Sequence, residues 1–323
     1  MIITRRSATA FLALQTIAPL LRAQSGFPSK TVQMISPSSS GSVTDLIGRI
    51  FSERLSKQIG QTVIIQNRPG AGSVIGTQAL VNAPADGYAL MLTNSAHAIN
   101  PAVIPNLPYD TAKDFATLAI VGEAPSVLFA TKTMGVKTVA EFVALAKQKP
   151  GFINYASAGN GSQSHLAGAA FAAQAGIEMT HVPYKNVPEI IPDMIEGRVQ
   201  ACFSTPGFLM QQARSGTLLA LGASTAEDMV DPIPVLSVRK HSGINYDYSV
   251  WYAIFTSAKT PKPIQEYWSA QILQALDDPA VKEKLAVQAL APRRITLAEA
   301  DDYVRRDVEK QRILVNSTSA RKN

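Results

Sequence analysis

Two loops rich in serine and glycine are the segments of this sequence best suited to bind a ligand. The first is Ser38-Ser39-Ser40-Gly41-Ser42, and the second is Ala158-Gly159-Asn160-Gly161-Ser162. Each follows an expected strand and precedes an expected helix. Backbone N–H groups at a helix N-terminus lack an intrahelical partner and carry partial positive charge. Small side chains let an anion approach them closely, so we predict carboxylate or phosphate binding.

A third polar loop, with Asn94 and Ser95, also follows an expected strand. A different interpretation of each loop is a plain turn, in which Ser162 or Thr44-Asp45 caps the next helix. For a single loop that interpretation would be preferred. The occurrence of two such loops, with Asn94 and Ser95 as a third, favours a ligand pocket.

Residues that would support catalysis or metal binding do not occur in the necessary patterns. The four histidines show no metal-ligand spacing, and Gly159-Asn160-Gly161-Ser162 is not a nucleophile elbow. The glycines of Gly70–Gly76 miss the dinucleotide-binding spacing, and the single cysteine, Cys202, lies in an apolar stretch. We therefore predict no catalytic residue, no metal and no cofactor, and a protein that is not an enzyme.

Short apolar runs that alternate with helix-patterned stretches predict an α/β fold with parallel sheets. Ligands bind such folds beyond the carboxyl ends of the strands, where the three loops would lie. The spacing predicts helices over 45–59, 139–148, 166–175 and 187–196, and strands over 31–35, 63–65, 88–93, 127–130, 199–203, 218–223 and 251–256. Three further helices are expected over 263–276, 279–290 and 297–315. The strand-loop-helix pattern near 40 recurs near 160, which suggests two halves facing one cleft.

The N-terminus has the pattern of a secretory signal peptide. Arg5-Arg6 precede a short apolar run that ends near Leu21, and Ala23 offers a cleavage site. We expect residues 1–23 to be removed and the protein to reach the periplasm. The two arginines fit either the general Sec route or twin-arginine (Tat) export.

Charge and length limit the partners and the domain count. Removing Arg5, Arg6 and Arg22 from the 30 basic residues leaves 27 against 24 acidic ones, a net charge of +3. This mild excess suits a small anionic ligand, and no basic stripe with interleaved aromatics indicates nucleic acid. A length of 323 residues is typical of two domains.

Several motifs in a fixed order resemble the receptors of tripartite tricarboxylate transporters, the Bug-type periplasmic solute-binding proteins. The resemblance covers almost the whole mature chain. It rests on Phe27–Lys30, Gln66–Gly72, Ala85–Tyr88, Asn100-Pro101, Leu107–Asp110, Asp114-Phe115, Asn154–Ser162, His165–Gly168, His181–Lys185 and Pro261–Ile264.

This resemblance implies a two-lobed clamshell of the type II-like periplasmic-binding-protein class, with a central sheet flanked by helices in each lobe. One lobe would combine residues 27–125 and 249–323, and the other would be 126–248. It also implies that backbone amides of Ser38–Ser42 and Ala158–Ser162 hold the ligand, with Asn94 and Ser95 nearby. Family ligands include di- and tricarboxylates, amino acids and aromatic acids.

Three positions depart from the family pattern. Ser38 replaces an aromatic residue, Ser42 replaces the second glycine of a pair, and Ser204 stands where an aspartate is frequent. Hydroxyls at Ser38 and Ser42 suggest a more polar pocket wall. Without the aspartate at 204, the ammonium of an amino acid would lack a partner, which argues against amino-acid ligands.

The sequence therefore predicts a monomeric extracytoplasmic receptor that captures a small organic carboxylate in the cleft between its lobes. It would deliver that ligand to the membrane subunits of a tripartite tricarboxylate-type transporter, or present it to a sensor kinase. The alternative is an exported enzyme acting on a small organic acid with the same scaffold. The sequence leaves the identity of the carboxylate open.

Overall fold

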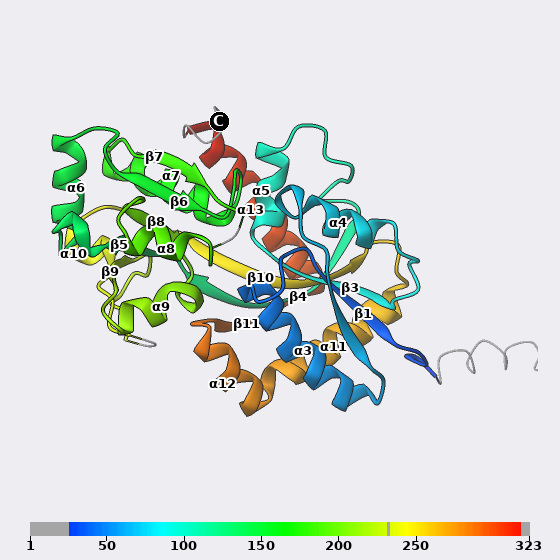
Figure 1. Cartoon of the computed structure of the whole chain (residues 1–323). Coiled ribbons are helices and arrows are strands. Elements are labelled where there is room, and N and C mark those ends of the chain that lie inside the picture. The colour runs from blue at the N-terminus through cyan, green and yellow to red at the C-terminus, as the bar shows by residue number, and fades with distance from the viewer. Residues whose placement is uncertain (1–25, 186, 231–232, 318–323) are drawn as a thin grey trace, which may run out of the picture.

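The computed structural model describes residues 26–185, 187–230 and 233–317. The predicted signal peptide, residues 1–23, lies outside this part of the chain. Figure 1 shows two sheets side by side, each with helices packed on it. Among the described residues, none of the helices is both long enough and apolar enough to span a bilayer.

The first lobe is built on a six-stranded sheet with the order β11-β4-β10-β3-β1-β2. β1, β2 and β3 pair in parallel, whereas β10, β4 and β11 add antiparallel pairs. The strands are β1 (Val32–Ser36), β2 (Val63–Asn67), β3 (Ala89–Asn94), β4 (Phe115–Pro125), β10 (Ser249–Ser257) and β11 (Ala291–Thr296).

Helices cover both faces of this sheet because its buried strands are apolar on both sides. Met34 and Leu90 point into a core with α3 (Val43–Ile59), α11 (Lys262–Asp277) and α12 (Pro279–Val287). The next residues along the strands, Ile35 and Met91, point into a second core. That core takes residues from α4 (Val74–Val81), α5 (Ala96–Val103) and α13 (Leu297–Ser317). The short turn η1 (Ala71–Ser73) precedes α4.

The second lobe is built on a five-stranded sheet with the order β7-β6-β8-β5-β9. β6 pairs in parallel with β7 and β8, while β5 is antiparallel to β8 and β9. The strands are β5 (Val127–Thr131), β6 (Asn154–Ser157), β7 (Thr180–Pro183), β8 (Ala201–Ser204) and β9 (Leu218–Ala223).

Helices also pack on both faces of the second sheet. Phe142 and Phe171 bring α6 (Val139–Gln148) and α7 (Gln163–Ala175) onto one face. Ile190 and Leu209 bring α8 (Ile190–Ile195) and α9 (Pro206–Arg214) onto the other, against Cys202. The short turn η2 (Lys132–Met134) follows β5, and α10 (Val238–Ser242) precedes β10.

The chain passes between the two sheets at Ser126, which joins β4 to β5, and again at Tyr248, just before β10. These crossings are hydrogen-bonded to each other. The amide of Ser126 donates to the carbonyl of Tyr248 (3.2 Å), and the hydroxyl of Ser224 donates to the same carbonyl (2.6 Å). Short, bonded crossings of this kind are typical hinge positions.

Two sequence expectations need correction. The sheets are mixed rather than parallel, because β4, β5, β9, β10 and β11 run antiparallel to their neighbours. The third polar loop is shorter than expected, because Asn94 still belongs to β3 and α5 begins at Ala96. Three further elements, β4, β11 and α9, were not predicted from the sequence.

Candidate functional site

A pocket of about 750 Å³ lies between the lobes and is lined by loops from both. Its volume is in the range of about 300–1,000 Å³ that small-molecule sites occupy. Ten of the predicted binding residues line it: Ser38, Ser39, Ser40, Ser42, Asn94, Ala158, Gly159, Asn160, Ser162 and Ser204. The other three, Gly41, Ser95 and Gly161, do not line it.

Ser38–Ser42 form the first wall, and the buried carboxylate of Asp45 fixes their conformation. Asp45 accepts hydrogen bonds from the Gly41 amide (2.9 Å), Asn67 Nδ2 (2.9 Å) and Arg49 Nε (3.0 Å). Burial works to raise the pKa of this carboxyl, but these donors outweigh it and lower the pKa. Asp45 therefore stays charged. Because the Gly41 amide donates to Asp45, that amide is not free to bind a ligand.

Ser42 has two roles at this wall. Its Oγ accepts a hydrogen bond from the Asp45 amide (3.2 Å), which makes it the N-cap of α3. Its hydroxyl hydrogen remains able to donate into the pocket. Among the described residues, the amides of Ser38–Ser40, Val43 and Thr44 have no hydrogen-bond acceptor. The first wall thus presents backbone and hydroxyl donors, as the sequence predicted for an anion.

Ala158–Ser162 form the second wall, and most of their amides are already bonded within the lobe. The Ala158 amide donates to Ser164 Oγ (3.0 Å), the Gly159 amide to Ser157 Oγ (3.2 Å), and the Gly161 amide to His165 Nδ1 (3.1 Å). Ser162 caps α7 through the His165 amide (3.3 Å). Among the described residues of this wall and the first turn of α7, the amides of Asn160, Gln163 and Ser164 are unbonded.

Five helices begin at the pocket, three from the first lobe and two from the second. Its lining includes Ser42 and Val43 of α3, Ser73 before α4, Ala96 of α5, Ser162–Ser164 of α7, and Thr205 before α9. A helix N-terminus carries roughly half a positive charge. Five N-termini around one cavity make a strongly favourable site for negative charge.

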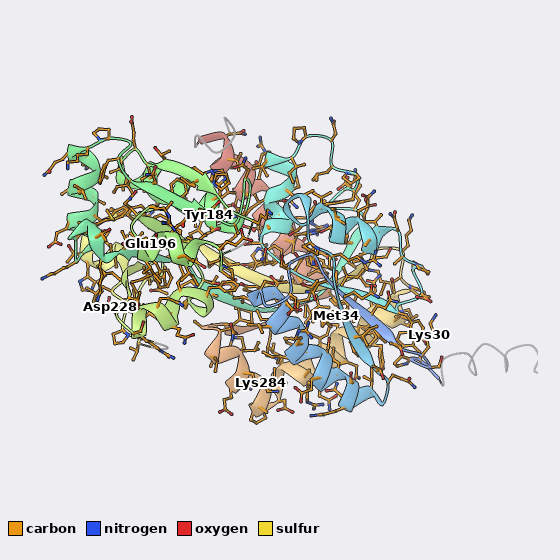
Figure 2. The ribbon with its side chains drawn as sticks, in the orientation of Figure 1. Lys30, Met34, Tyr184, Glu196, Asp228 and Lys284 are labelled. Atoms are coloured by element: carbon orange, nitrogen blue, oxygen red, sulfur yellow. The ribbon has the colours of Figure 1, made fainter. Side chains whose placement is uncertain are left out.

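The side chains of the lining agree with this polarity. Among the described lining residues Lys185 is the only charged one, and none is acidic. Figure 2 shows the neighbouring Tyr184 on the part of the second lobe that lies toward the first. Phe208 and Tyr252 add aromatic surface, and burial raises the pKa of Tyr252, so its hydroxyl is neutral.

Several lining residues were not predicted from the sequence: the Pro69–Ser73 loop, Tyr184, Lys185, Thr205 and Tyr252. The Pro69–Ser73 loop resembles the predicted loops in sequence, since it follows a strand, β2, and contains two glycines. Tyr252 had no such signal, because it lies inside β10 and reaches the pocket only through the pairing of β10 with Asn94 of β3.

Histidine and cysteine side chains are not among the described residues that line this pocket. Among the described residues, no cluster of three or more His, Cys, Asp or Glu side chains could hold a metal ion. Cys202 is buried, and burial raises the pKa of its thiol to about 12. None of the histidines is among the described lining residues.

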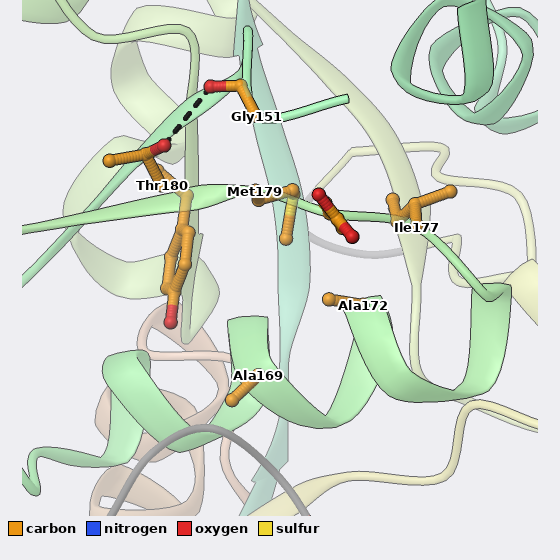
Figure 3. Close-up of a pocket in the computed structure, with 8 residues that line it drawn as sticks. Gly151, Ala169, Ala172, Ile177, Met179 and Thr180 are labelled. Atoms are coloured by element: carbon orange, nitrogen blue, oxygen red, sulfur yellow. Dashed lines mark hydrogen bonds between the residues drawn. The ribbon is translucent and has the colours of Figure 1, made fainter. Parts of the chain in front are cut away.

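A smaller pocket of about 280 Å³ lies in the second lobe, between α7 and the β7 edge. Figure 3 shows its apolar lining from Ala169, Ala172 and Met179, and the hydrogen bond from Thr180 to the Gly151 carbonyl (3.0 Å). Its charged lining residue is Glu178. It contains none of the predicted binding residues and offers an anion no helix N-terminus.

Comparisons with known proteins agree with this geometry. A family model described as the tripartite tricarboxylate transporter family receptor matches residues 47–319. Protein BugT of Bordetella pertussis is 30% identical over 314 residues, which cover 96% of each chain.

Solved structures show the same fold. One described as a periplasmic transporter has a TM-score of 0.83 at 28% identity and covers 90% of this chain and 97% of its own. Rpa4515 of R. palustris with adipate has a TM-score of 0.85 at 25% identity, covering 90% and 98%. MatC from Rhodopseudomonas palustris with bound malate has a TM-score of 0.80 at 26% identity, covering 90% and 100%. The predicted two-lobed α/β fold is confirmed.

Proposed function

The chain belongs to the tripartite tricarboxylate transporter receptor family, and from this premise we propose that it is a periplasmic receptor that binds a small organic carboxylate between its lobes. The convergence of five helix N-termini on a pocket whose described lining has one cation and no acidic side chain carries this proposal. Such an environment stabilises a carboxylate without a dedicated arginine. The adipate and malate held by two structural neighbours support the same ligand class.

The ligand-binding groups in this proposal are the unbonded amides and hydroxyls of the two walls. Ser38–Ser40 and Ser42 would act from the first lobe. Beside them lies Asn94, whose Nδ2 donates to Thr44 Oγ1 (3.2 Å) and has a second hydrogen for a ligand. Asn160, Ser162 and the first amides of α7 would act from the second, with Lys185 setting a preference for anions. Ser204 is buried, and its hydroxyl donates to the Thr205 carbonyl (3.2 Å). It gives an ammonium group no negative partner, so acids without an amine should bind better than amino acids.

The lobe boundaries belong to the same proposal. Residues 27–125 with 249–323 would form one rigid half, and 126–248 the other, with Ser126 and Tyr248 at the hinge. Closure of the halves would bring both walls onto one ligand. The receptor would then present the ligand to transporter membrane subunits or to a sensor kinase.

A thermal-shift screen of the mature protein, followed by calorimetry, tests the ligand class. The panel would contain malate, succinate, adipate and citrate, with aspartate and glutamate as matched amino acids. A ligand at 100 times its Kd stabilises the native state by about 2.7 kcal/mol, so a true ligand raises Tm measurably. We expect at least one amine-free acid to do so, and aspartate and glutamate to bind more weakly.

Two results would contradict the proposal. If none of the acids changes Tm while a neutral solute does, the pocket does not select anions. If the bound acid is recovered chemically altered after incubation, the protein is an exported enzyme rather than a receptor. Recovery of the unchanged acid supports the receptor.

A further inference from the structure

Two histidines form a stacked pair directly behind the second wall of the pocket. His165 lies in the first turn of α7 and is 1% exposed, and His181 lies in β7. Their ring centroids are 3.8 Å apart and the rings are inclined by 11°. Neither ring is among the lining residues, so any effect on a ligand must pass through the loop between them and the pocket.

The pair is bonded to both ends of that loop. His165 Nδ1 accepts the hydrogen bond from the Gly161 amide (3.1 Å). His181 Nε2 lies 2.6 Å from Ser157 Oγ, and that oxygen also accepts from the Gly159 amide (3.2 Å). Residues 157–161 are therefore held at their start by His181 and at their end by His165.

The bond to Gly161 requires a particular protonation state. An amide N–H can donate only to an unprotonated ring nitrogen, so His165 must be neutral with its hydrogen on Nε2. The bond between His181 and Ser157 has no such requirement, because Ser157 can accept from a protonated Nε2. A proton on His165 Nδ1 would leave two N–H groups facing each other, and Gly161 would have to move.

We propose that His165 is a positioning residue that holds the 157–161 loop in its ligand-binding conformation and releases it when Nδ1 is protonated. The inference rests on the proposed function of the loop as a ligand wall. His181 supports it by stacking on the ring and by holding Ser157.

The surroundings of the two histidines decide the pH at which the loop is released. Burial lowers the pKa of His165 to about 4. Burial and the neighbouring His165 lower the pKa of His181 to about 4 as well. Besides each other, the titratable side chain packed on the pair is Tyr155 of β6, whose hydroxyl donates to the His165 carbonyl (3.5 Å). No carboxylate or cation contributes to either shift, so the loop stays fixed at neutral pH and is released near pH 4.

Movement of Gly161 would also disturb the contact between the lobes. A Cβ placed on Gly161 would lie 2.7 Å from Val103 Cγ2 at the end of α5. The Gly161 backbone therefore lies against the first lobe, and its displacement alters both the wall and the approach of the lobes. We expect acid to weaken ligand binding through both changes.

Two substitutions at His165 separate the roles of the acceptor and the proton. His165→Asn places an amide oxygen near the former Nδ1 position, so it can accept from Gly161 but cannot be protonated. His165→Leu removes the acceptor at every pH. With malate and adipate as probes, we expect near wild-type affinity at pH 7 for His165→Asn and about tenfold weaker binding for His165→Leu.

The pH profile supplies the decisive measurement. Carboxylate probes titrate near pH 4 themselves, so the quantity to follow is the ratio of wild-type to His165→Asn affinity, in which the ligand's own protonation cancels. Half of His165 is protonated at its pKa of about 4, so we expect this ratio to fall about twofold between pH 6 and pH 4 and at least threefold by pH 3.5. A constant ratio, or loss of binding in His165→Asn as severe as in His165→Leu, would overturn the proposal.

Nuclear magnetic resonance of the ligand-free protein tests the positioning role without any ligand. The Gly161 amide resonance should titrate with a midpoint near pH 4 in the wild type and not in His165→Asn. The amide of the exposed Gly135, which donates to the Lys132 carbonyl (3.1 Å), is an internal control. If Gly161 titrates but neither probe binds, the positioning is correct and the proposed ligand class is wrong. If Gly161 does not titrate, the positioning role is wrong whatever the ligand.

Discussion

His97 is a buried imidazole whose two ring nitrogens have no hydrogen-bond partner among the described residues. It packs among Tyr109, Phe115 and Phe255 in the first lobe. Burial lowers its pKa from 6.5 to about 3. No sequence signal separates His97 from the other histidines, because what distinguishes it is an aromatic environment that only the tertiary structure assembles.

This residue should make stability depend on pH. Above pH 6.5 the folded and unfolded states both hold a neutral imidazole. Below pH 6.5 the unfolded chain takes up a proton that the folded protein excludes down to about pH 3, so stability is lost across that window. We expect His97→Leu to remove this contribution. Urea melts should show the wild type losing about 2 kcal/mol more than the variant between pH 6.5 and 4.5. Equal losses would mean that His97 is protonated in the native state.

At the scale of single residues, the sequence predicted which groups could donate hydrogen bonds in the pocket better than it predicted which of them remain free for a ligand. Serines and glycines at strand ends were recognisable because their chemistry is local. The hydrogen bonds that occupy the Gly41 and Gly161 amides were not recognisable. Gly41 donates to Asp45 and Gly161 donates to His165. Both acceptors lie four residues further along the chain, and whether such a side chain turns back to the loop depends on burial.

Among the elements, α3 and α7 were predictable because their signals are local. Ser42 and Ser162 cap them, and Gly60 and Gly176 end them with left-handed φ values of 68° and 61°. β4 was missed because its eleven residues are almost all buried and show no alternation. Its length and its place between β10 and β11 come from pairing with segments over 120 residues away.

The N-terminus of α9 offers a test of how a helix end serves the pocket. Thr205 is its N-cap residue, but its side chain makes no capping hydrogen bond, and Pro206 occupies the first helical position. Thr205→Asp would supply a good cap and a favourable charge for the helix, worth about 0.5–1 kcal/mol. The same carboxylate would enter the pocket, where Thr205 is a lining residue. Thr205 is only 3% exposed, so burying the carboxylate offsets the capping gain. We therefore expect no net gain of stability in urea melts and at least tenfold weaker binding of the carboxylate ligand.

Thr205→Asn is the matched control for this prediction. Its side chain has nearly the shape of aspartate and caps about as well, but it is neutral. It should gain stability and keep most of the ligand affinity measured by calorimetry. If Asn and Asp weaken binding equally, shape rather than charge governs this part of the pocket. If Asp binds the ligand as well as the wild type, the α9 terminus does not face the carboxylates.

On the scale of the whole molecule, the two lobes meet across the pocket at two glycines. Gly161 of the second lobe approaches Val103, and Gly207 of α9 approaches Val43 of α3 and Gln288 after α12. The proposed hinge at Ser126 and Tyr248 lies elsewhere, at the two hydrogen-bonded crossings of the chain. Because glycine has no side chain, the lobes can close at these two contacts until the glycine backbone meets side chains of the first lobe. No local sequence signal reveals such contacts, since each joins residues from different lobes.

Gly207→Ala should therefore hold the lobes apart without harming the fold. The residue lies inside α9 and has no positive φ, so alanine suits its backbone and favours the helix by up to about 1 kcal/mol. Its Cβ would lie 2.6 Å from Gln288 Oε1 and 3.2 Å from Val43 Cγ2, both in the first lobe. Gln288 Oε1 ends a flexible side chain that can turn aside, whereas Val43 Cγ2 must shift slightly. We expect an unchanged or higher Tm in the absence of ligand, about threefold weaker carboxylate binding, and a smaller ligand-induced decrease of the radius of gyration in X-ray scattering. Adding Gln288→Ala removes the closer of the two contacts and should restore part of the affinity. An unchanged affinity in Gly207→Ala would mean that ligand binding does not require the approach of α9 to α3.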